Sequence, residues 1–380
     1  MNQPDRRLRV AITKGTLRIP PTYFALSHAE VLGADHDFRA FTLVSEVLDH
    51  ALQTDVRDFV PRRSGTFRSR ELVMPAFMPV MTAALLRYRA QVIHQHFATW
   101  SLPAVAAARL ARTPLLTTLH GADVYVAGRK PVTAMQRWHH ANIRAANAQS
   151  RRLLAVSKYL ADTAVANGYR GSTMEVHYQG IDATFFTPPE QPPRATADPP
   201  IILFVGALVH RKGVLDLARA ARILAEKHPH RLVFVGDGPL HAALEAELRE
   251  HPDARVLGSL NRESVRGWMR QAHLLAVPSQ EENGWREAAG LVSLEAEACG
   301  TPVVAYASGG ISEMVLDGET GLLAAEADLG ALTDSLAQVL ALPDAEYQAM
   351  RARARDFVVT SRSLETSCAE LEQHYRDVIG

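Results

Sequence analysis

Two glutamates eight positions apart, Glu287 and Glu295, have residue types and a spacing suited to binding a polar ligand. Between them Gly290 and Leu291 begin a stretch typical of a short helix that ends at Gly300. Carboxylates accept hydrogen bonds from hydroxyl groups, and the amide groups and dipole at the start of a helix attract anions. This pattern favours a ligand with both hydroxyl groups and phosphates. The alternative is two glutamates on the solvated face of a charged helix.

The sequence around these glutamates resembles the signature of the retaining glycosyltransferases of family 4. From position 287 it reads E-A-A-G-L-V-S-L-E-A-E-A-C-G-T-P-V-V. Further motifs that resemble those of the family occur along the chain in the family's order. They are H-Q-H-F at 94–97, T-L-H-G-A-D at 118–123, G-I-D at 180–182, F-V-G at 204–206, K-G at 212–213, V-G-D-G-P at 235–239 and S-G-G-I-S-E at 308–313. Each motif is short, but the ordered set spans both halves of the chain. The first half is similar to the bacterial branch that builds exopolysaccharide or lipopolysaccharide.

The resemblance implies a GT-B fold, an α/β architecture of two doubly wound Rossmann-like domains with an interdomain cleft. It implies a metal-independent, hexosyltransferase-type enzyme that moves a sugar from a nucleotide diphosphate sugar, with UDP or GDP favoured, to an acceptor hydroxyl. The anomeric configuration would be retained. The acceptor would be a polyprenyl-linked or other glycan of bacterial surface polysaccharide synthesis. The nucleotide sugar is a donor substrate, so we expect no cofactor, no metal and no nucleic acid partner.

The family's site residues can be carried over position by position. The resemblance implies that Glu287 holds hydroxyl groups of the donor sugar and that Glu295 holds those of the ribose. It also implies that Lys212 neutralises the departing diphosphate and that His120 touches the donor sugar beside the anomeric carbon. His120, Glu287 and Lys212 are therefore the expected catalytic residues. The expected donor-binding residues also include Gly15, Arg211, Gly206, Gly236, Gly290, Leu291 and Glu295.

Three positions depart from the family pattern. The arginine that usually follows the strand glycine is Ala207 here, and we hypothesise that Arg211 supplies the second phosphate cation. The loop before the signature is longer and contains Glu282, but the spacing to Gly290 favours Glu287 as the first signature acid. The expected front loop, 14–16, has one glycine where two are common.

The elements that must position these residues follow from the hydrophobic pattern. Apolar, β-rich runs alternate with stretches of helical periodicity such as 214–228. The expected strands are Leu8–Thr13, Val92–His96, Leu115–Leu119 and Leu153–Ser157, then Ile201–Gly206, Leu232–Gly236, Leu274–Pro278 and Val303–Tyr306. Continuous apolar strands that alternate with helices are typical of parallel sheets covered on both faces, and two such series predict two domains. Ligands bind at the carboxyl ends of such strands.

The domain boundary is expected where prolines crowd residues 188–200, because such a segment is typical of a semi-rigid connector. We therefore expect an acceptor-side Rossmann-like domain at 1–187, a linker at 188–200 and a nucleotide-sugar-binding domain at 201–362. The last amphipathic helix, within 363–380, could pack back on the first domain.

The charge is unevenly distributed along a chain whose formal net charge is zero. Residues 1–190 contain 23 Lys and Arg against 14 Asp and Glu, which leaves 18 against 27 for the remainder, so the first half is basic. Much of this excess lies in the Arg57–Arg70 segment, which is either a solvated loop or a peripheral contact with an anionic membrane. No run reaches the ~18 apolar residues of a spanning helix. The start, 1–9, is charged and the chain has two cysteines, so we expect a cytoplasmic protein that could lie at the inner face of the plasma membrane.

The sequence contains one possible metal motif and is compatible with two alternative functions. Asp35-His36-Asp37 imitates the metal-binding acidic pair of the other glycosyltransferase fold, but a surface loop is the favoured interpretation. A nucleotide-sugar 2-epimerase with the GT-B fold would act without an acceptor. A catalytically silent carbohydrate-binding protein would at most bind the nucleotide. Both signature acids, Lys212 and His120 together favour the transferase.

Overall fold

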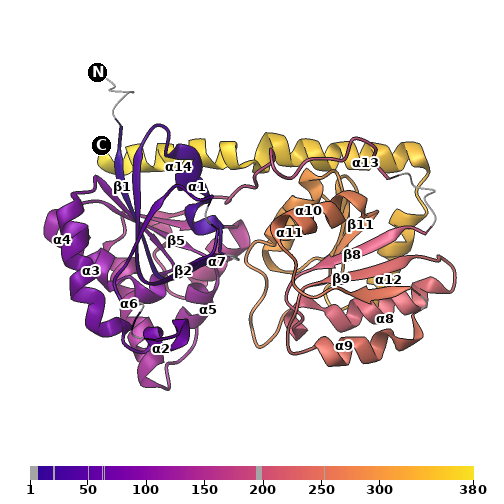
Figure 1. Ribbon diagram of the computed structural model, residues 1–380, viewed down its shortest axis with the longest axis horizontal. Coiled ribbons are helices and arrows are strands. Elements are labelled where there is room, and N and C mark those ends of the chain that lie inside the picture. Colours follow the sequence, from indigo (N-terminus) through magenta and orange to yellow (C-terminus); the bar gives the residue numbers. More distant parts are fainter. Residues whose placement is uncertain are drawn as a thin grey trace. The chain divides into compact units, whose positions relative to one another are not determined.

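The computed structural model describes residues 7–19, 22–49, 51–61, 63, 65–193, 199–251 and 253–380. The chain forms two compact units, one of Met1–Gln179 with Ser367–Gly380 and the other of Gly180–Thr366 (Figure 1). Each unit has a parallel sheet with helices on both faces, which is the doubly wound arrangement that the alternating pattern predicts.

The first unit contains a seven-stranded parallel sheet in the order β3-β2-β1-β4-β5-β6-β7. Its strands are β1 (Arg9–Ile19), β2 (Asp37–Val47), β3 (Asp55–Asp58), β4 (Val92–His96), β5 (Leu115–Leu119), β6 (Arg152–Ala155) and β7 (Met174–Val176). Strands β4 and β5 are buried along their whole length, as their unbroken apolar pattern predicts.

Strand β1 differs from the prediction. The sequence indicates a strand that ends at Thr13 and a loop at 14–16, whereas β1 continues to Ile19. The reason is its long neighbour β2, which pairs with β1 in parallel register from Arg9↔Asp37 to Ile19↔Val47. Gly15 therefore lies inside a strand and not in a phosphate-binding loop.

The helices of the first unit are α1 (Phe24–Leu32), α2 (Phe67–Glu71), α3 (Met74–Tyr88), α4 (Leu102–Ala111), α5 (Ala122–Ala127), α6 (Ala134–Gln149) and α7 (Lys158–Ala166), with short 3-10 turns η2 (Ala98–Trp100) and η3 (Gly171–Thr173). The last helix, α14 (Leu364–Ile379), joins them through its residues from Ser367 onward. Its Tyr375 hydroxyl lies 2.7 Å from His94 Nδ1, and Ser367 Oγ lies 2.8 Å from His28 Nε2. The chain's carboxyl end is thus part of the first unit's core.

The second unit contains a six-stranded parallel sheet in the order β10-β9-β8-β11-β12-β13. Its strands are β8 (Ile201–Val205), β9 (Arg231–Val235), β10 (Ala254–Val256), β11 (Leu274–Val277), β12 (Val303–Tyr306) and β13 (Gly321–Ala324). Helices α8 (Val214–Ala225), α9 (His241–Glu247) and α12 (Leu329–Leu340) cover one face, and α10 (Arg262–Gln271), α11 (Leu291–Ala298) and α13 (Asp344–Phe357) cover the other (Figure 1). Shorter turns are η4 (His210–Lys212), η5 (Leu248–Glu250), η6 (Gly309–Glu313) and the π-helical η7 (Val358–Arg362).

The segment after Gln179 belongs to the second unit, whereas the sequence pattern suggests a boundary after 187. Ile181 donates its amide to the carbonyl of Arg362 at 2.9 Å, and the Arg355 guanidinium donates to the carbonyls of Ala183 and Phe186. The proline-rich segment is held in the same way, because Arg270 donates to the carbonyl of Pro188. An irregular segment has no periodicity that could reveal these contacts; residues 194–198 lie outside the described part of the chain.

Each sheet has one point where the strand order reverses. In the second unit it lies between β8 and β11, and in the first between β1 and β4. In open α/β sheets, ligands bind beyond the carboxyl ends of the strands at this point. Lys212 and Glu287 lie in segments that follow the two strands at the second unit's point of reversal, β8 and β11.

Candidate functional site

In the second unit the two strands that flank the switch point each lead into a predicted site segment. Strand β8 is followed by η4, which carries Arg211 and Lys212, and β11 is followed by the loop that carries Glu287. Parallel strands bring their carboxyl ends to one edge of the sheet, so residues 75 positions apart meet there. The Lys212 ammonium donates a hydrogen bond to Glu287 Oε2.

The Lys212–Glu287 pair is partly buried, with 20% and 21% of the two side chains exposed. Burial by itself would raise the pKa of Glu287, but the charge and hydrogen bond of Lys212, with the charge of Arg211, outweigh it and lower that pKa. Glu287 is therefore a carboxylate at neutral pH. It can accept hydrogen bonds from hydroxyl groups through the oxygen that Lys212 leaves free.

Arg211 lies in the same turn and is held through its backbone. Its carbonyl accepts the amide of Gln280 at 2.8 Å, which ties the η4 turn to the loop after β11. Its side-chain Nε is buried and has no hydrogen-bond partner among the described residues. A buried guanidinium nitrogen without a partner is costly, and an anionic ligand would satisfy it.

Gly213 ends the η4 turn in a conformation that only glycine adopts easily. Its φ is +65°, and a Cβ at this position would lie 1.9 Å from the carbonyl oxygen of Pro278. The missing side chain lets the β8 turn approach the end of β11 closely. This contact fixes the position of Lys212 beside Glu287.

The loop from Glu287 to Gly290 rests against η6. The Gly310 amide donates to the carbonyl of Glu287 at 2.9 Å, and a Cβ on Gly290, whose φ is +76°, would lie 2.9 Å from Ile311 Cγ1. Gly290 caps α11, and Leu291 is its first residue. The first amides of a helix have no intrahelical acceptor, so the start of α11 offers hydrogen-bond donors to an anion.

Glu295 lies in the second turn of α11. No hydrogen bond joins its carboxyl group to another described residue, and burial raises its pKa to about 7 while the charge of Arg262 opposes the shift. The spacing of the signature selects Glu295 over Glu297, two positions on. Glu297 is fully buried and accepts a 2.6 Å hydrogen bond from Thr320, so it belongs to the core.

Gly206 and Gly236, which were predicted to bind the donor, have backbone amides that already donate hydrogen bonds within the sheet edge. The Gly206 amide donates to the carbonyl of Val235 and the Gly236 amide to that of Gly258, at 2.9 and 2.8 Å. A Cβ on Gly236 would lie 1.8 Å from the Gly206 carbonyl oxygen. The two glycines allow close approach of the ends of β8 and β9, and their amides cannot also bind phosphate.

The loop that precedes the signature is held by a separate ion-pair network. Arg286 donates to Glu326 at 2.9 Å and pairs with Glu281 at the same distance. The backbones of Glu282 and Trp285 form a short antiparallel bridge. These contacts give Glu281 and the backbone of Glu282 a structural role, and Glu287 is the acid that contacts Lys212.

In the first unit, His120 follows the carboxyl end of β5. Buried Asp123 organises this turn, because its carboxylate accepts the amides of His120, Gly121 and Ala98 within 3.0 to 3.2 Å. The His120 ring lies between Phe24 and Phe97, with ring centroids at 4.7 and 4.4 Å. Burial, followed by the charge of a nearby lysine, holds the pKa of His120 well below its usual range. His120 is therefore a neutral hydrogen-bonding group and not a proton donor at neutral pH.

Both ring nitrogens of His120 have partners. Gln179 donates from Nε2 to His120 Nδ1 at 3.3 Å, and His120 Nε2 lies 3.0 Å from His96 Nδ1. With the glutamine amide assigned in this orientation, His120 carries its proton on Nε2. This pairing fixes the ring through Gln179 and through His96, which ends the H-Q-H of the 94–97 motif.

Lys14 is a further residue that the sequence did not single out. It is 8% exposed, donates to the carbonyl of Thr16 at 2.8 Å and lies 5.1 Å from the Phe97 ring centre. Burial lowers its pKa to about 8. Neighbouring Gly15 has a packing role, since a Cβ there would lie 2.5 Å from Trp100. The sequence signal for Lys14 was its position next to Gly15, which was predicted to bind the donor.

The Arg57–Arg70 segment is not a uniform surface patch. Arg57, Arg63 and Arg68 are exposed, whereas Arg70 is 5% exposed and donates to Asp58 and to the carbonyl of Val60. Arg70 therefore stabilises the fold, and Arg62 lies outside the described residues. No helix in the described ranges has the length and hydropathy needed to cross a bilayer.

The Asp35–Asp37 motif has other contacts. His36 is buried and accepts the Leu8 amide on Nδ1 at 3.3 Å, while Asp37 pairs with Arg9 at 3.2 Å. Across the described part of the chain, no three His, Cys, Asp or Glu side chains come together in a way that could hold a metal ion.

Comparisons with known proteins identify the family of this chain. The model of the glycosyltransferase family 4 matches residues 24–185, and that of the glycosyl transferases group 1 matches residues 189–357. A D-inositol 3-phosphate glycosyltransferase of Frankia alni is 30% identical over 71% of this chain and 72% of its own length. The corresponding enzyme of an Arthrobacter species is 29% identical, over 66% of this chain and 64% of its own length.

Among solved structures, an Anabaena protein, HepE, in complex with UDP and glucose matches with a TM-score of 0.75 at 16% identity. The match covers 98% of this chain and all of that one. At this identity the likeness concerns the fold alone, and with the two Rossmann-like units described above it gives the GT-B class. The two family models and the Frankia relative together establish that the chain belongs to the family 4 glycosyltransferases.

Proposed function

We propose that this protein transfers a sugar from a nucleotide diphosphate sugar, most simply UDP- or GDP-linked, to an acceptor hydroxyl. The observation that carries the proposal is the Lys212–Glu287 pair at the switch point of the second sheet, beside Arg211 and the start of α11. This arrangement offers cations and amides for a diphosphate and a carboxylate for sugar hydroxyls within one unit.

The chemistry explains why such groups are needed. When the bond between the anomeric carbon and the diphosphate breaks, positive charge develops on the sugar and negative charge on the leaving diphosphate. Lys212, Arg211 and the first amides of α11 would stabilise that negative charge, and each preorganised donor of this kind is worth roughly 10²–10³-fold in rate. We therefore propose that these protein groups carry out the charge stabilisation without a metal.

The two signature acids would bind different parts of the donor. Glu287, ionised and already paired with Lys212, would accept hydrogen bonds from hydroxyl groups of the transferred sugar. Glu295, whose carboxyl group has no hydrogen bond within the described chain, would accept hydrogen bonds from the ribose hydroxyls. The role of His120 at the donor sugar rests on the family resemblance. Its imidazole is neutral and oriented, and it would have to exchange its contact with His96 or Gln179 for one with a sugar hydroxyl.

Retention of the anomeric configuration is part of the proposal and has no protein nucleophile assigned to it. In a front-face route the leaving phosphate accepts the proton of the acceptor hydroxyl as the new bond forms. Nuclear magnetic resonance of the product identifies its anomeric configuration directly. An inverted product would reject this part of the proposal and leave the transferase assignment intact.

The acceptor that we propose is a polyprenyl-linked or other glycan of bacterial surface polysaccharide synthesis. The exposed cations Arg57, Arg63 and Arg68 would contact anionic headgroups at the inner face of the plasma membrane. Co-sedimentation with anionic vesicles tests this contact. Equal binding by the protein with all three arginines changed to glutamine would reject it.

The donor is tested with the full chain. A thermal-shift screen of UDP, GDP, ADP and their sugars identifies the ligand that stabilises the folded protein. The selected sugar nucleotide is then incubated with and without glycan acceptors, and its products are separated. Transfer that requires an acceptor supports the proposal. An epimerised nucleotide sugar without acceptor, or binding with no turnover by any acceptor, would favour the 2-epimerase or the silent binding protein respectively.

The replacement of the missing family arginine is tested in the same assay. Arg211→Gln should lower the rate of transfer at least tenfold if Arg211 is the second phosphate cation. The substitution removes the guanidinium group, so the leaving diphosphate would lose one of its two positively charged partners. Arg219, an exposed arginine on neighbouring α8, provides the matched control as Arg219→Gln. Wild-type kinetics in Arg211→Gln would reject the role.

A further inference from the structure

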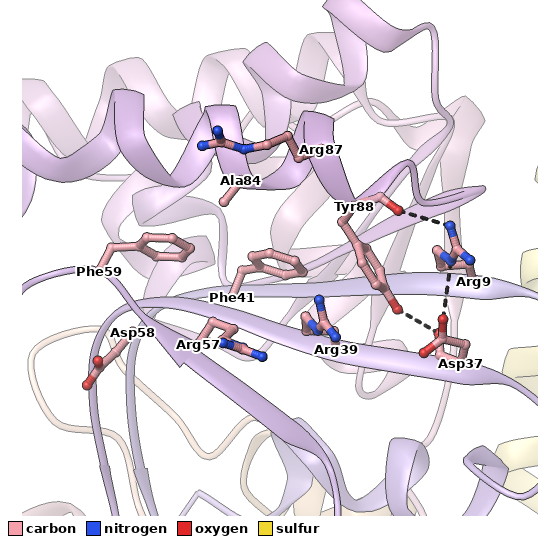
Figure 2. Close-up of a pocket in the computed structure, with 10 residues that line it drawn as sticks. All are labelled: Arg9, Asp37, Arg39, Phe41, Arg57, Asp58, Phe59, Ala84, Arg87 and Tyr88. Atoms are coloured by element: carbon pink, nitrogen blue, oxygen red, sulfur yellow. Dashed lines mark hydrogen bonds and ion pairs between the residues drawn. The ribbon is translucent and has the colours of Figure 1, made fainter.

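We propose that the first unit binds a phosphate monoester in an arginine-lined pocket that is separate from the glycosyl-transfer site. The pocket has a volume of about 670 Å³ and lies between the β1-β2-β3 side of the sheet and the last turns of α3 (Figure 2). It is lined by Arg9, Asp37, Arg39, Phe41, Arg57, Asp58, Phe59, Ala84, Arg87 and Tyr88.

Strand register explains why the arginines gather there. In the parallel pairing, Arg9 stands beside Asp37, Arg39 beside Asp55 and Phe41 beside Arg57. Side chains at alternate positions of a strand share one face of the sheet, so these residues point to the same side. Helix α3 packs on that side and adds Arg87 from its last turn.

The charges at the pocket do not balance. Arg9 is paired with Asp37, but Arg39 and Arg57 share one carboxylate, that of Asp55, at 2.8 and 3.0 Å.

Asp58 is already neutralised by buried Arg70 at 2.9 Å. Arg87 is exposed and has no ion pair or hydrogen bond with another described residue. One arginine of the shared pair and Arg87 therefore leave an excess of about two positive charges, which matches the charge of a phosphate monoester near neutral pH.

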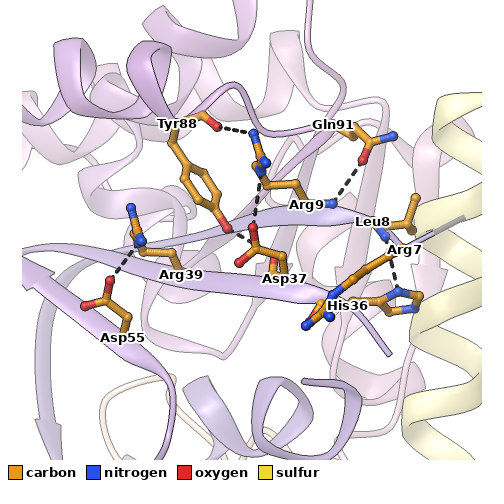
Figure 3. Close-up of polar contacts among 9 residues, drawn as sticks. All are labelled: Arg7, Leu8, Arg9, His36, Asp37, Arg39, Asp55, Tyr88 and Gln91. Carbon is orange, nitrogen blue, oxygen red and sulfur yellow. Dashed lines mark hydrogen bonds and ion pairs between the residues drawn. The ribbon is translucent and has the colours of Figure 1, made fainter. Parts of the chain in front are cut away.

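Two of the arginines are held in place before a ligand arrives. The ring of Tyr88 has the guanidinium carbons of Arg9 and Arg39 at 5.6 and 5.0 Å from its centre. The Tyr88 hydroxyl donates to the carbonyl of Asp37 at 3.1 Å, and its own carbonyl accepts from Arg9 at 3.3 Å (Figure 3). Guanidinium groups ordered in this way lose less freedom when they bind an anion.

The pocket also has an apolar wall and room for an organic substituent. The rings of Phe41 and Phe59 lie within 6° of parallel with centroids 6.2 Å apart. Arg9 and Asp37 also line an adjoining hollow of about 450 Å³, to which Arg7 and Arg89 contribute. These features suit the carbon part of a phosphate ester better than an isolated inorganic ion.

The pocket is distinct from the predicted catalytic residue of the same unit. Arg9 and Asp37 are the first residues of β1 and β2, whereas His120 follows the carboxyl end of β5. Because the sheet is parallel, these residues lie at opposite edges of it. The lining residues Asp58 and Phe59 come at and after the end of β3, which is the outer strand of the sheet and is separated from β5 by β2, β1 and β4. A ligand in the pocket therefore need not compete with the nucleotide sugar.

The experiment measures binding of glycerol 3-phosphate and inorganic phosphate to the full-length protein by isothermal titration calorimetry, with glycerol as the uncharged comparison. The Arg57→Gln/Arg87→Gln variant removes the two exposed cations. Arg109→Gln is the matched control, because Arg109 is also an exposed arginine in the last turn of a helix, α4. We expect the double variant to weaken glycerol 3-phosphate binding at least tenfold and the control to leave it unchanged.

Vesicles distinguish the source of the phosphate. Binding to phosphatidic acid vesicles that glycerol 3-phosphate displaces, and that Arg87→Gln alone weakens, would assign the pocket to a lipid headgroup, because Arg87 lines the pocket and is not part of the proposed membrane contact. Binding of the soluble ester without binding to vesicles would assign it to a free metabolite. Failure of the protein to bind either form, or equal weakening by Arg109→Gln, would overturn the proposal. Unchanged thermal stabilisation by the nucleoside diphosphate in the double variant verifies that its donor site is intact.

Discussion

Glu295 provides a quantitative test of the donor site because its ionisation coincides with neutral pH. Burial raises its pKa to about 7, against an ordinary value of 4.5. Only the ionised carboxylate is a strong acceptor for two ribose hydroxyl groups. We therefore expect the affinity for the nucleoside diphosphate to increase with pH through neutrality, and the Glu295→Gln variant to lose that increase.

The magnitude follows from the fraction that is ionised. With a pKa of about 7, this fraction is about 0.1 at pH 6 and about 0.9 at pH 8, so the dissociation constant should fall roughly tenfold, or about 1.4 kcal/mol. The phosphates of the ligand also titrate in this range, but equally for both proteins. The ratio of the two dissociation constants at each pH therefore isolates the contribution of Glu295.

The same shift predicts a gain in stability for the variant without ligand. The folded-state pKa lies above the unfolded value, so the unfolded chain loses this proton first and stability falls as pH rises from 4.5 to 7. A shift of this size corresponds to roughly 3 kcal/mol at pH 8. Glu295→Gln should recover part of that cost at pH 8 and none at pH 4.

The assays are calorimetric titration with the nucleoside diphosphate at pH 6, 7 and 8, and urea unfolding of the free protein at pH 4 and 8. Glu263→Gln, which changes an exposed glutamate in the first turn of α10, is the control. If Glu295→Gln retained the full pH dependence of binding, Glu295 would not contact the ribose. If it also left stability unchanged at pH 8, the burial argument would be wrong.

Three further outcomes are expected. Lys212→Met should lower kcat about 10²–10³-fold, measured in the transfer assay, and a loss under threefold would remove Lys212 from the charge stabilisation. Gly213→Ala should lower the melting temperature and the nucleotide affinity more than Gly258→Ala does. Both glycines have positive φ, but only Gly213 has a backbone atom within 1.9 Å of the added carbon, so equal effects would refute the clash. Burial lowers the pKa of His28 to about 3 and that of His177 to about 4, so both are neutral in the folded state, and stability is lost as pH falls below the unfolded value of 6.5. From pH 7 to 5 the loss should be roughly 2 kcal/mol for each, measured by urea unfolding, and a His177→Gln variant with an undiminished pH slope would contradict this assignment.

Buried strands were the elements that sequence reasoning located best. The strands Val92–His96, Leu115–Leu119 and Val303–Tyr306 have the predicted bounds, because a strand buried on both faces is an unbroken apolar run between polar turns. Strand β2, Asp37–Val47, was not predicted. Its polar residues, such as Arg39, are stabilised by neighbouring strands and not by a local pattern.

The candidate site divides in a similar way. Residue types and order along the chain were enough to nominate Glu287, Glu295 and Lys212, and the family models confirm the family that those motifs indicate. The roles of these residues stay predictions. Sequence reasoning did not indicate that Lys14 lies in the surroundings of His120, because Lys14 belongs to β1 and His120 follows β5, and the two meet only through the sheet.

The sequence by itself determined the class of fold, the family and the acids and cations of the second unit, because those depend on local periodicity and on ordered motifs. Tertiary structure alone decided which members of these groups are available to a ligand. Glu297 and Arg70 look as polar as Glu295 and Arg57 in the sequence, yet Thr320 and Asp58 engage them in the interior. Burial and partner choice depend on residues distant along the chain, and these two factors set the charge and reactivity of each side chain.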